Sequence, residues 1–313
     1  MNARPIPAAL ALLVVLACAL PVPPAAAQAP RPDRGLQRAI DSAVAGFHGK
    51  VGVYVRHLRT GRTAAIDPDS VFPTASMIKV PILVATFDAI RRGALRYDDS
   101  LVYRDSLMYP GGDILGMAKD SSRIDLSRVI MLMITMSDNT AALWLQQLAG
   151  TGTAINDWLG THGFDSTRMN SRTPGRHGNW EKYGWGQTTP REIARLLTMI
   201  RREEAVSPAA SQQMYRALTR IYWNGDALSQ IPPWVQAASK SGAVDQSRSE
   251  VVLVNAPSGD YVFAVLTKEN ADTSWTRTNE ATTLIRRISA LLWRRFEPKH
   301  PWRPAPGAEL LAP

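Results

Sequence analysis

The sequence predicts an α/β (α+β) fold in which N- and C-terminal segments build one antiparallel sheet of about five strands, flanked by helices, with an all-helical lobe inserted between them. Two observations predict this fold: β-rich runs occur near both ends of the chain, at residues 51–66 and 250–267, and the stretch between them has mainly helical periodicity. The composition agrees, because a chain of 313 residues that is 45% hydrophobic and 20% charged can bury a core. At this length we expect one large domain or two interleaved lobes.

The N-terminal part of the body predicts a helix followed by a hairpin. Residues 35–47 carry apolar side chains at helical spacing. Residues 51–58 form a β-rich run, and residues 63–66 continue it after a Thr-Gly turn.

The middle and the C-terminal part predict the inserted lobe and the return of the sheet. Strands are expected at residues 250–255 and 261–267, and a final amphipathic helix at 279–296. Pro190 stands at an N1-like position, where its fixed φ favours a helix start. The helices expected in the lobe cover residues 77–92, 126–136, 141–148, 154–162 and 189–203.

The N-terminus predicts export to the periplasm or the exterior. Residues 1–27 have the short basic start, apolar run and small-residue exit of a secretory signal peptide. The alternative places Cys18 in a lipobox and makes it a lipid-anchored N-terminus. Neither interpretation leaves a membrane span in the mature chain. The remaining boundaries that we expect are a linker at 28–33, a globular body at 34–297 with its helical lobe at about 77–225, and a Pro-rich tail at 298–313.

Charge and cysteine usage exclude several classes of function. The net charge is +9, but the basic residues are dispersed or paired rather than gathered in a stripe with aromatics, so we expect no nucleic-acid partner. One cysteine permits neither an internal disulfide nor a thiolate metal site, and the five histidines lack zinc-site spacing. We therefore expect no metal and no cofactor, and a monomer by default.

Ser76 and Lys79 form an S-x-x-K motif at the start of a predicted helix. This spacing puts the hydroxyl and the amine on one face, one turn apart, so that a lysine with a lowered pKa can take the hydroxyl proton. The helix N-terminus would add N–H groups directed at a developing oxyanion. The alternative is a helix-capping serine beside a solvated lysine, but the apolar residues around Lys79 indicate a buried one.

Two further motifs follow along the chain. Ser137, Asp138 and Asn139 lie between two predicted helices, where such residues also serve as caps and turns. Lys240 opens a Lys-Ser-Gly-Ala segment before the C-terminal strands, where a lysine and a hydroxyl on a strand edge could bind a carboxylate. The alternative for this segment is a turn with an exposed lysine.

Together the three motifs resemble the serine β-lactamase and penicillin-binding protein superfamily, and most closely the class A β-lactamases, whose signature is S-x-x-K, S-D-N and K-[ST]-G. The segments Phe72–Lys79, Ile134–Ala142 and Gln187–Leu197 all resemble class A segments. The order of the lobes matches over about residues 34 to 297, which the resemblance makes a β-lactamase/transpeptidase-like catalytic domain.

The resemblance implies roles for individual residues. Ser76 would be the acylated nucleophile, Lys79 its proton acceptor or relay, and Ser137 a relay to the leaving nitrogen. The backbone N–H groups of Ser76 and Ala243 would form the oxyanion hole. Substrate contacts would come from Asn139 for the side-chain amide, from Lys240, Ser241 and Gly242 of the K-S-G motif for the carboxylate, from Arg248 as a second carboxylate contact one residue short of the usual spacing, and from Tyr109, which with Ala243 would shape substrate preference.

One departure from the family concerns deacylation. Class A enzymes use a glutamate in an Ω-loop as the base, but the matching position here is Thr173, and the usual Arg/Asp brace is missing. Glu181, the one carboxylate of the loop, and His177 are the candidate replacements, while Thr173 could at most position water. The alternative is that both are ordinary surface residues of a Gly-rich loop.

Three hypotheses follow. The first is a serine hydrolase that opens the β-lactam amide through an acyl-enzyme on Ser76, a class A-like β-lactamase conferring antibiotic resistance. The second is a peptidoglycan D,D-peptidase or penicillin-binding protein that β-lactams inhibit. The third is a β-lactam-binding sensor module. The expected partner is thus a small-molecule β-lactam or a peptidoglycan peptide.

Overall fold

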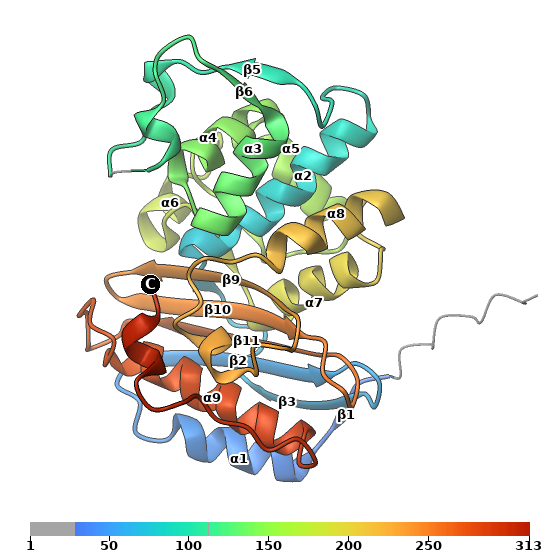
Figure 1. The fold of residues 1–313 in the computed structure, drawn as a ribbon, viewed down its shortest axis with the longest axis vertical. Helices are drawn as coiled ribbons and strands as arrows, with labels where there is room; N and C mark the ends of the chain where they lie inside the picture. The colour runs from blue at the N-terminus through green and yellow to red at the C-terminus, as the bar shows by residue number, and fades with distance from the viewer. Residues whose placement is uncertain (1–28, 112) are drawn as a thin grey trace, which may run out of the picture.

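A computed structural model describes residues 29–111 and 113–313. The expected signal peptide and Cys18 lie outside these residues. Over the described residues no helix is long and apolar enough to cross a membrane. The chain folds into a mixed α/β structure with a sheet between two helical layers (Figure 1).

The central sheet has six strands in the order β1-β3-β2-β11-β10-β9. All neighbours are antiparallel except the two-residue β1, which lies in the expected linker and pairs in parallel with β3. The strands are β1 (Arg31–Pro32), β2 (Lys50–His57), β3 (Arg62–Ile66), β9 (Ala237–Val244), β10 (Ser247–Val254) and β11 (Tyr261–Lys268). Both ends of the chain therefore build the sheet, as predicted from the distribution of β-rich runs.

One face of the sheet is covered by α1 (Arg34–Val44) and α9 (Glu280–Phe296) (Figure 1). Asp33 begins α1 by accepting the Leu36 N–H, and Asn279 begins α9 by accepting two N–H groups of its first turn. The apolar stripes of both helices pack on alternate residues of the strands, such as Val252 and Phe263, in a continuous buried cluster.

The helical lobe covers the other face. A turn of 3₁₀ helix, η1 (Ala75–Ile78), leads into α2 (Lys79–Arg91). Helix α2 is buried all round from Lys79 to Phe87, as a helix at the centre of a lobe must be. The other helices of the lobe are α3 (Leu126–Met131), a π-helical turn η4 (Leu132–Met136), α4 (Asn139–Leu148), α5 (Thr151–Thr161), α6 (His177–Tyr183), α7 (Pro190–Arg201) and α8 (Pro208–Leu218).

The remaining elements are short. Strands β4 (Phe72–Pro73), β7 (Arg168–Met169) and β8 (Gly186–Thr188) form a small sheet, and β5 (Ser100–Val102) pairs with β6 (Arg123–Asp125). Single 3₁₀ turns are η2 (Asp105–Leu107), η3 (Leu115–Met117), η5 (Ala227–Gln230) and η6 (Ala308–Leu311). The strand β9 and the helices α6 and α8 were not among the elements predicted from the sequence.

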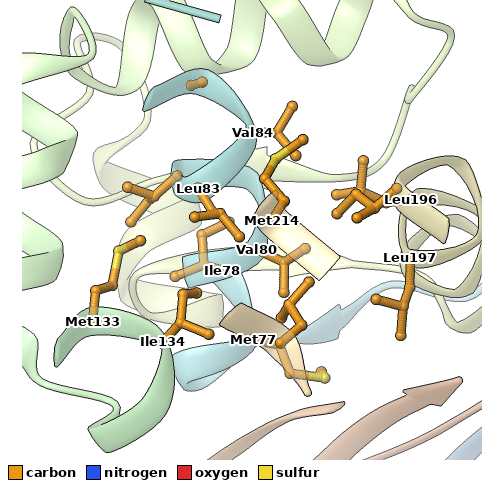
Figure 2. Close-up of a cluster of buried hydrophobic side chains, with 14 of the residues drawn as sticks. Met77, Ile78, Val80, Leu83, Val84, Met133, Ile134, Leu196, Leu197 and Met214 are labelled. Carbon is orange, nitrogen blue, oxygen red and sulfur yellow. The ribbon is translucent and has the colours of Figure 1, made fainter. Parts of the chain in front are cut away.

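The core of the lobe lies directly behind the start of α2. Figure 2 shows Met77 and Ile78 packed with Val80, Leu83 and Val84 of α2, and with side chains from η4, α7 and α8 around them. This packing fixes the N-terminal end of α2 against the sheet edge, where Ser76 and Lys79 lie. The three sequence motifs therefore meet where the helical lobe contacts β9.

Candidate active site

The S-x-x-K motif forms a serine–lysine pair at the first turn before α2. Lys79 is fully buried, and its Nζ lies 3.0 Å from the Ser76 Oγ. The residue before the nucleophile, Ala75, has φ of 42°, a backbone conformation that L-residues rarely adopt. The local backbone thus directs the Ser76 hydroxyl at the lysine, and the capping interpretation of Ser76 does not hold: no side chain caps this turn.

The second motif, Ser137-Asp138-Asn139, supplies further hydrogen-bond partners for Lys79. The Nζ of Lys79 lies 3.1 Å from Ser137 Oγ, 2.5 Å from Ser137 O and 2.7 Å from Asn139 Oδ1. Ser137 ends the π-helical turn with φ of 60°, and its N–H bonds back to Leu132 O. A π-helical turn followed by a left-handed residue re-directs a side chain that a regular helix would hold elsewhere.

Asp138 supports this arrangement in the capping role that the sequence also allowed. Its carboxylate accepts the Ala141 N–H at the start of α4 and the Leu115 N–H, each at 2.8 Å. Burial raises the pKa of Asp138. Asp113, which sequence analysis missed, accepts the N–H groups of Asn139 and Thr140 at 2.9 and 2.7 Å.

The pKa of Lys79 is lowered well below its ordinary value, chiefly by burial and next by the charge of Lys240. The negative charges of Asp113 and Asp138 oppose this shift. A neutral Nζ has a lone pair and can accept the Ser76 proton, which an ammonium cannot. The site therefore holds a lysine suited to act as a general base.

The third motif is on β9, the edge strand of the sheet. Lys240 is fully buried, and its Nζ donates to Ser137 Oγ at 3.0 Å and to Ser241 O at 3.1 Å. The hydroxyl of Ser137 consequently bridges two lysines. The turn with an exposed lysine, which was the alternative for this segment, is wrong.

Gly242 allows β9 to approach the nucleophile. A Cβ on Gly242 would lie 2.2 Å from Thr74 O and 3.0 Å from the backbone nitrogen of Ser76. Only glycine fits this contact, which brings the next residue, Ala243, into the wall of the same cavity as Ser76. Two N–H groups close together beside a serine hydroxyl are the arrangement that an oxyanion hole needs.

A cavity of about 470 Å³ opens onto Ser76 and is lined by Asn139, Tyr109 and Ala243. Lys182, Lys268 and Glu269 also line it, so the charged side chains of its lining are two cations and one anion. Trp185, a second residue that sequence analysis missed, lies with its ring 6.0 Å from the Lys79 Nζ. Its ring packs edge-on against that of Tyr109, with centroids 5.3 Å apart.

Tyr109 and Trp185 separate this cavity from a second one, of about 600 Å³, under the Ω-loop. Thr173 and His177 line the second cavity. The Thr173 hydroxyl donates to Ser171 O at 3.0 Å, and the side chain packs against Gly152 of α5. His177 and Glu181 pair at 3.1 Å on the outside of α6, with side chains 80% and 63% exposed.

Among the described residues, the Ω-loop (residues 170–186) makes no hydrogen bond to Lys79. The hydrogen bonds of the Lys79 Nζ go to Ser76, Ser137 and Asn139. The structure therefore brings Ser76, Ser137 and Asn139 to Lys79 but does not bring Glu181 to them. Instead of an Arg/Asp pair, the loop is braced by Arg176, which donates to Asn170 Oδ1 at 2.8 Å and to Gln187 Oε1 at 2.9 Å.

Arg248 has other partners than a substrate carboxylate. Its guanidinium donates to the backbone oxygens of Val244, Ser247 and Ser274 and lies 4.1 Å from the centre of the Trp275 ring. It is not among the described residues that line the cavity at Ser76. The arginine one position from the usual spacing thus secures the hairpin between β9 and β10.

The described residues also contain no group of three or more His, Cys, Asp or Glu side chains that could hold a metal ion. The sheet and the helical lobe bring together a serine–lysine pair, a second serine bonded to both lysines, and the buried Lys240 of β9. This fold and site define the class of serine β-lactamase-like and penicillin-binding-protein-like proteins. Over residues 35–296 the chain matches the β-lactamase enzyme family, and it belongs to that family.

The known proteins that are similar to this chain include both a β-lactamase and a protein named PBP-A. The β-lactamase VEB-1 of Pseudomonas aeruginosa is 20% identical over 269 residues, which cover 82% of this chain and 89% of VEB-1. The solved structure of PBP-A has a TM-score of 0.77 and 28% identity, with 87% of this chain and 99% of that chain covered. A PBP-A mutant with the same values was solved as an acyl-enzyme complex with penicillin G. The fold and the class A resemblance predicted from the sequence are confirmed.

Proposed function

We propose that this protein is an exported acyl-serine enzyme of the penicillin-binding type, a D,D-peptidase that attacks peptidoglycan stem peptides and that β-lactams acylate and block. One observation carries the proposal: the residues for acylation are assembled around Ser76, whereas the candidate bases for deacylation, Glu181 and His177, are paired on the outer face of α6. The solved penicillin G acyl-enzyme of a PBP-A mutant supports the same chemistry.

The acylation step follows from the geometry. Neutral Lys79 takes the proton of Ser76 Oγ, and the oxygen attacks the amide or lactam carbonyl carbon. The N–H groups of Ser76 and Ala243 stabilise the oxyanion. Ser137, bonded to both lysines, delivers a proton to the nitrogen as its bond to the carbonyl carbon breaks, leaving an ester on Ser76.

Substrate binding in this scheme uses the anionic end of the ligand. D-Ala-D-Ala peptides and β-lactams both carry a carboxylate next to the amide that is broken, and Lys240 with Ser241 would hold it. Asn139 and the rings of Tyr109 and Trp185 would contact the acyl side chain, because all three line the cavity at Ser76. Tyr109 and Trp185 also line the second cavity, under the Ω-loop.

The experiment incubates the purified mature protein with a chromogenic cephalosporin and follows colour release and intact protein mass together. We expect colour release close to one equivalent and a lasting adduct on Ser76, and release of D-alanine from a diacyl-D-Ala-D-Ala peptide. Ser76→Ala should lose adduct formation by about 10⁴-fold or more. Sustained colour release by the wild type would contradict the proposal.

A β-lactamase is the second candidate, and the observation that favours it is His177 in the lining of the cavity next to the acylation site. Sustained turnover would support it. In that case His177→Ala should slow deacylation and leave acylation unchanged, with Glu181→Gln as the matched test of the other loop residue. Unchanged turnover in both variants would exclude the two residues as the base.

A further inference from the structure

Glu250 is a buried carboxylate in the middle of the sheet that the proposed reaction does not use. It lies on β10, is 1% exposed, and shares its face with Val252 and Val254, which pack under α9. Its oxygens accept from Ser239 Oγ at 2.5 Å and from the Ala227 N–H at 2.8 Å. In the part of the chain that the structure describes, Glu250 takes part in no ion pair.

Glu250 lies on β10, the strand next to β9, which carries Lys240. Lys240 is the lysine that we propose binds the substrate carboxylate, and we call this place the carboxylate site. In the antiparallel register Lys240 is the partner of Val251, and Ser241 is the partner of Glu250. Lys240 points to the lobe and Glu250 to α9, because neighbouring positions of a strand face opposite sides. Both ionisable groups are buried and lie on adjacent strands, one position apart in the register, so their charges interact with little screening.

The hydrogen bonds of Glu250 do not require a charge. A glutamine could accept from the Ala227 N–H with its oxygen and interact with the Ser239 hydroxyl through its amide. A neutral amide would also be less costly to bury than a carboxylate. The presence of an ionisable group at this position is thus the property that remains to be explained.

We propose that Glu250 is a positioning residue that keeps Lys240 protonated, so that the carboxylate site retains its positive charge as the pH rises. The inference rests on the proposed function, in which Lys240 binds the carboxylate of the substrate. Glu250 touches neither substrate nor reacting atoms and acts through the lysine.

The sign of the effect follows from the pKa shifts. Burial lowers the pKa of Lys240 to about 8, and the charge of Glu250 opposes this shift. Burial first, and then the charge of Asp226, raises the pKa of Glu250 to about 8. When Glu250 is ionised, its negative charge raises the affinity of Lys240 for its proton.

The other charged groups around Glu250 are Asp226, Arg286 and Arg248. Asp226, just before η5, is itself buried with a raised pKa, and Arg286 of α9 and Arg248 of β10 offset its charge. The Ser289 hydroxyl of α9 donates to Ala227 O at 2.8 Å and holds η5 in place without adding a charge. Ser289 thus supplies a matched control for the packing of the cluster.

The test measures the second-order rate of acylation of Ser76 by a fluorescent penicillin between about pH 6 and pH 9 for the wild type, Glu250→Gln and Ser289→Ala. We expect Glu250→Gln to match the wild type at pH 6 and to have its alkaline midpoint about one pH unit lower, which makes it up to about 10-fold slower at the alkaline end. Ser289→Ala should keep the wild-type midpoint.

The outcomes separate the inference from the proposed function. An unshifted midpoint in Glu250→Gln, or a rate reduced equally at every pH, would overturn the role of Glu250 and leave the acyl-enzyme assignment intact. A wild type that is not acylated at any pH would instead overturn the proposed function.

Discussion

At the scale of one residue, burial changes the acid–base behaviour of Lys79. An ordinary lysine is protonated at neutral pH and cannot accept a proton. Here a fully buried amine faces a second lysine, and these two causes outweigh the opposing charges of Asp113 and Asp138 in setting the direction of its pKa shift. The apolar residues that bury Lys79 are therefore as necessary for activation of Ser76 as the amine itself.

Gly242 is a residue of the site at which a larger side chain cannot be accommodated without moving the backbone. We expect Gly242→Ala to lower the acylation rate by at least about 10²-fold, since a Cβ at 2.2 Å from Thr74 O must displace β9 from Ser76. The melting temperature should fall as well, because the overlap involves backbone on both sides. Gly178→Ala is the matched control, because a Cβ there would meet nothing within 4 Å. Equal acylation rates in the two variants would show that the approach of β9 is not needed.

The burial of Lys79 could be predicted from its apolar neighbours, and the family resemblance of the three motifs predicted that Ser137 and Lys240 lie at the same site. Asp113 and Trp185 could not, because no local pattern distinguishes them. Asp113 acts through the N–H groups of α4, 26 and 27 positions further along the chain, and Trp185 through its position between two cavities. Arg248 shows the limit of spacing, since a shift of one residue on a strand turns a side chain to the other face.

At the scale of elements, the Ω-loop is held by Arg176. We expect Arg176→Ala to increase hydrogen exchange of backbone amides over residues 170–186, because it removes the bonds to Asn170 and Gln187. The global melting temperature should change by only a few degrees, since Trp185 is the one residue of the loop that packs against a buried cluster among the described residues.

Arg172 provides the control for this prediction. It belongs to the same loop and is exposed, and no hydrogen bond or ion pair is seen for it in the described structure. Arg172→Ala should therefore leave exchange unchanged. Equal exchange in both variants would mean that Arg176 is not the brace.

Two elements differ from the sequence prediction for physical reasons. The helix predicted over residues 126–136 changes to a π-helical turn after Met131, which periodicity alone cannot reveal because its apolar pattern continues. The Lys-Ser-Gly-Ala segment was expected on a strand edge, but the bounds of β9 were not predicted, because its residues are mostly small or polar and show no alternating apolar pattern. Both differences occur at the site, where function overrides local preference.

At the scale of the whole molecule, the sheet joins two cores into one structure. Leu83 lies in the core of the lobe and Ile288 in the layer of α9, each fully buried. We expect Leu83→Ala and Ile288→Ala each to lower the free energy of unfolding by about 2–5 kcal/mol. Both should shift the same single transition, measured by circular dichroism and tryptophan fluorescence in parallel. Two transitions, with one variant affecting only one of them, would show that the lobes unfold independently.

The pairing of β2 with β11 also determines when the site can exist. These strands are neighbours in the sheet although roughly 200 residues separate them in the chain. A ribosome therefore finishes the nucleophile long before it finishes Lys240 and the strands beside it. The nascent chain carries Ser76 and Lys79 long before Lys240, and the site is complete only after β9 has been synthesised and has joined the sheet.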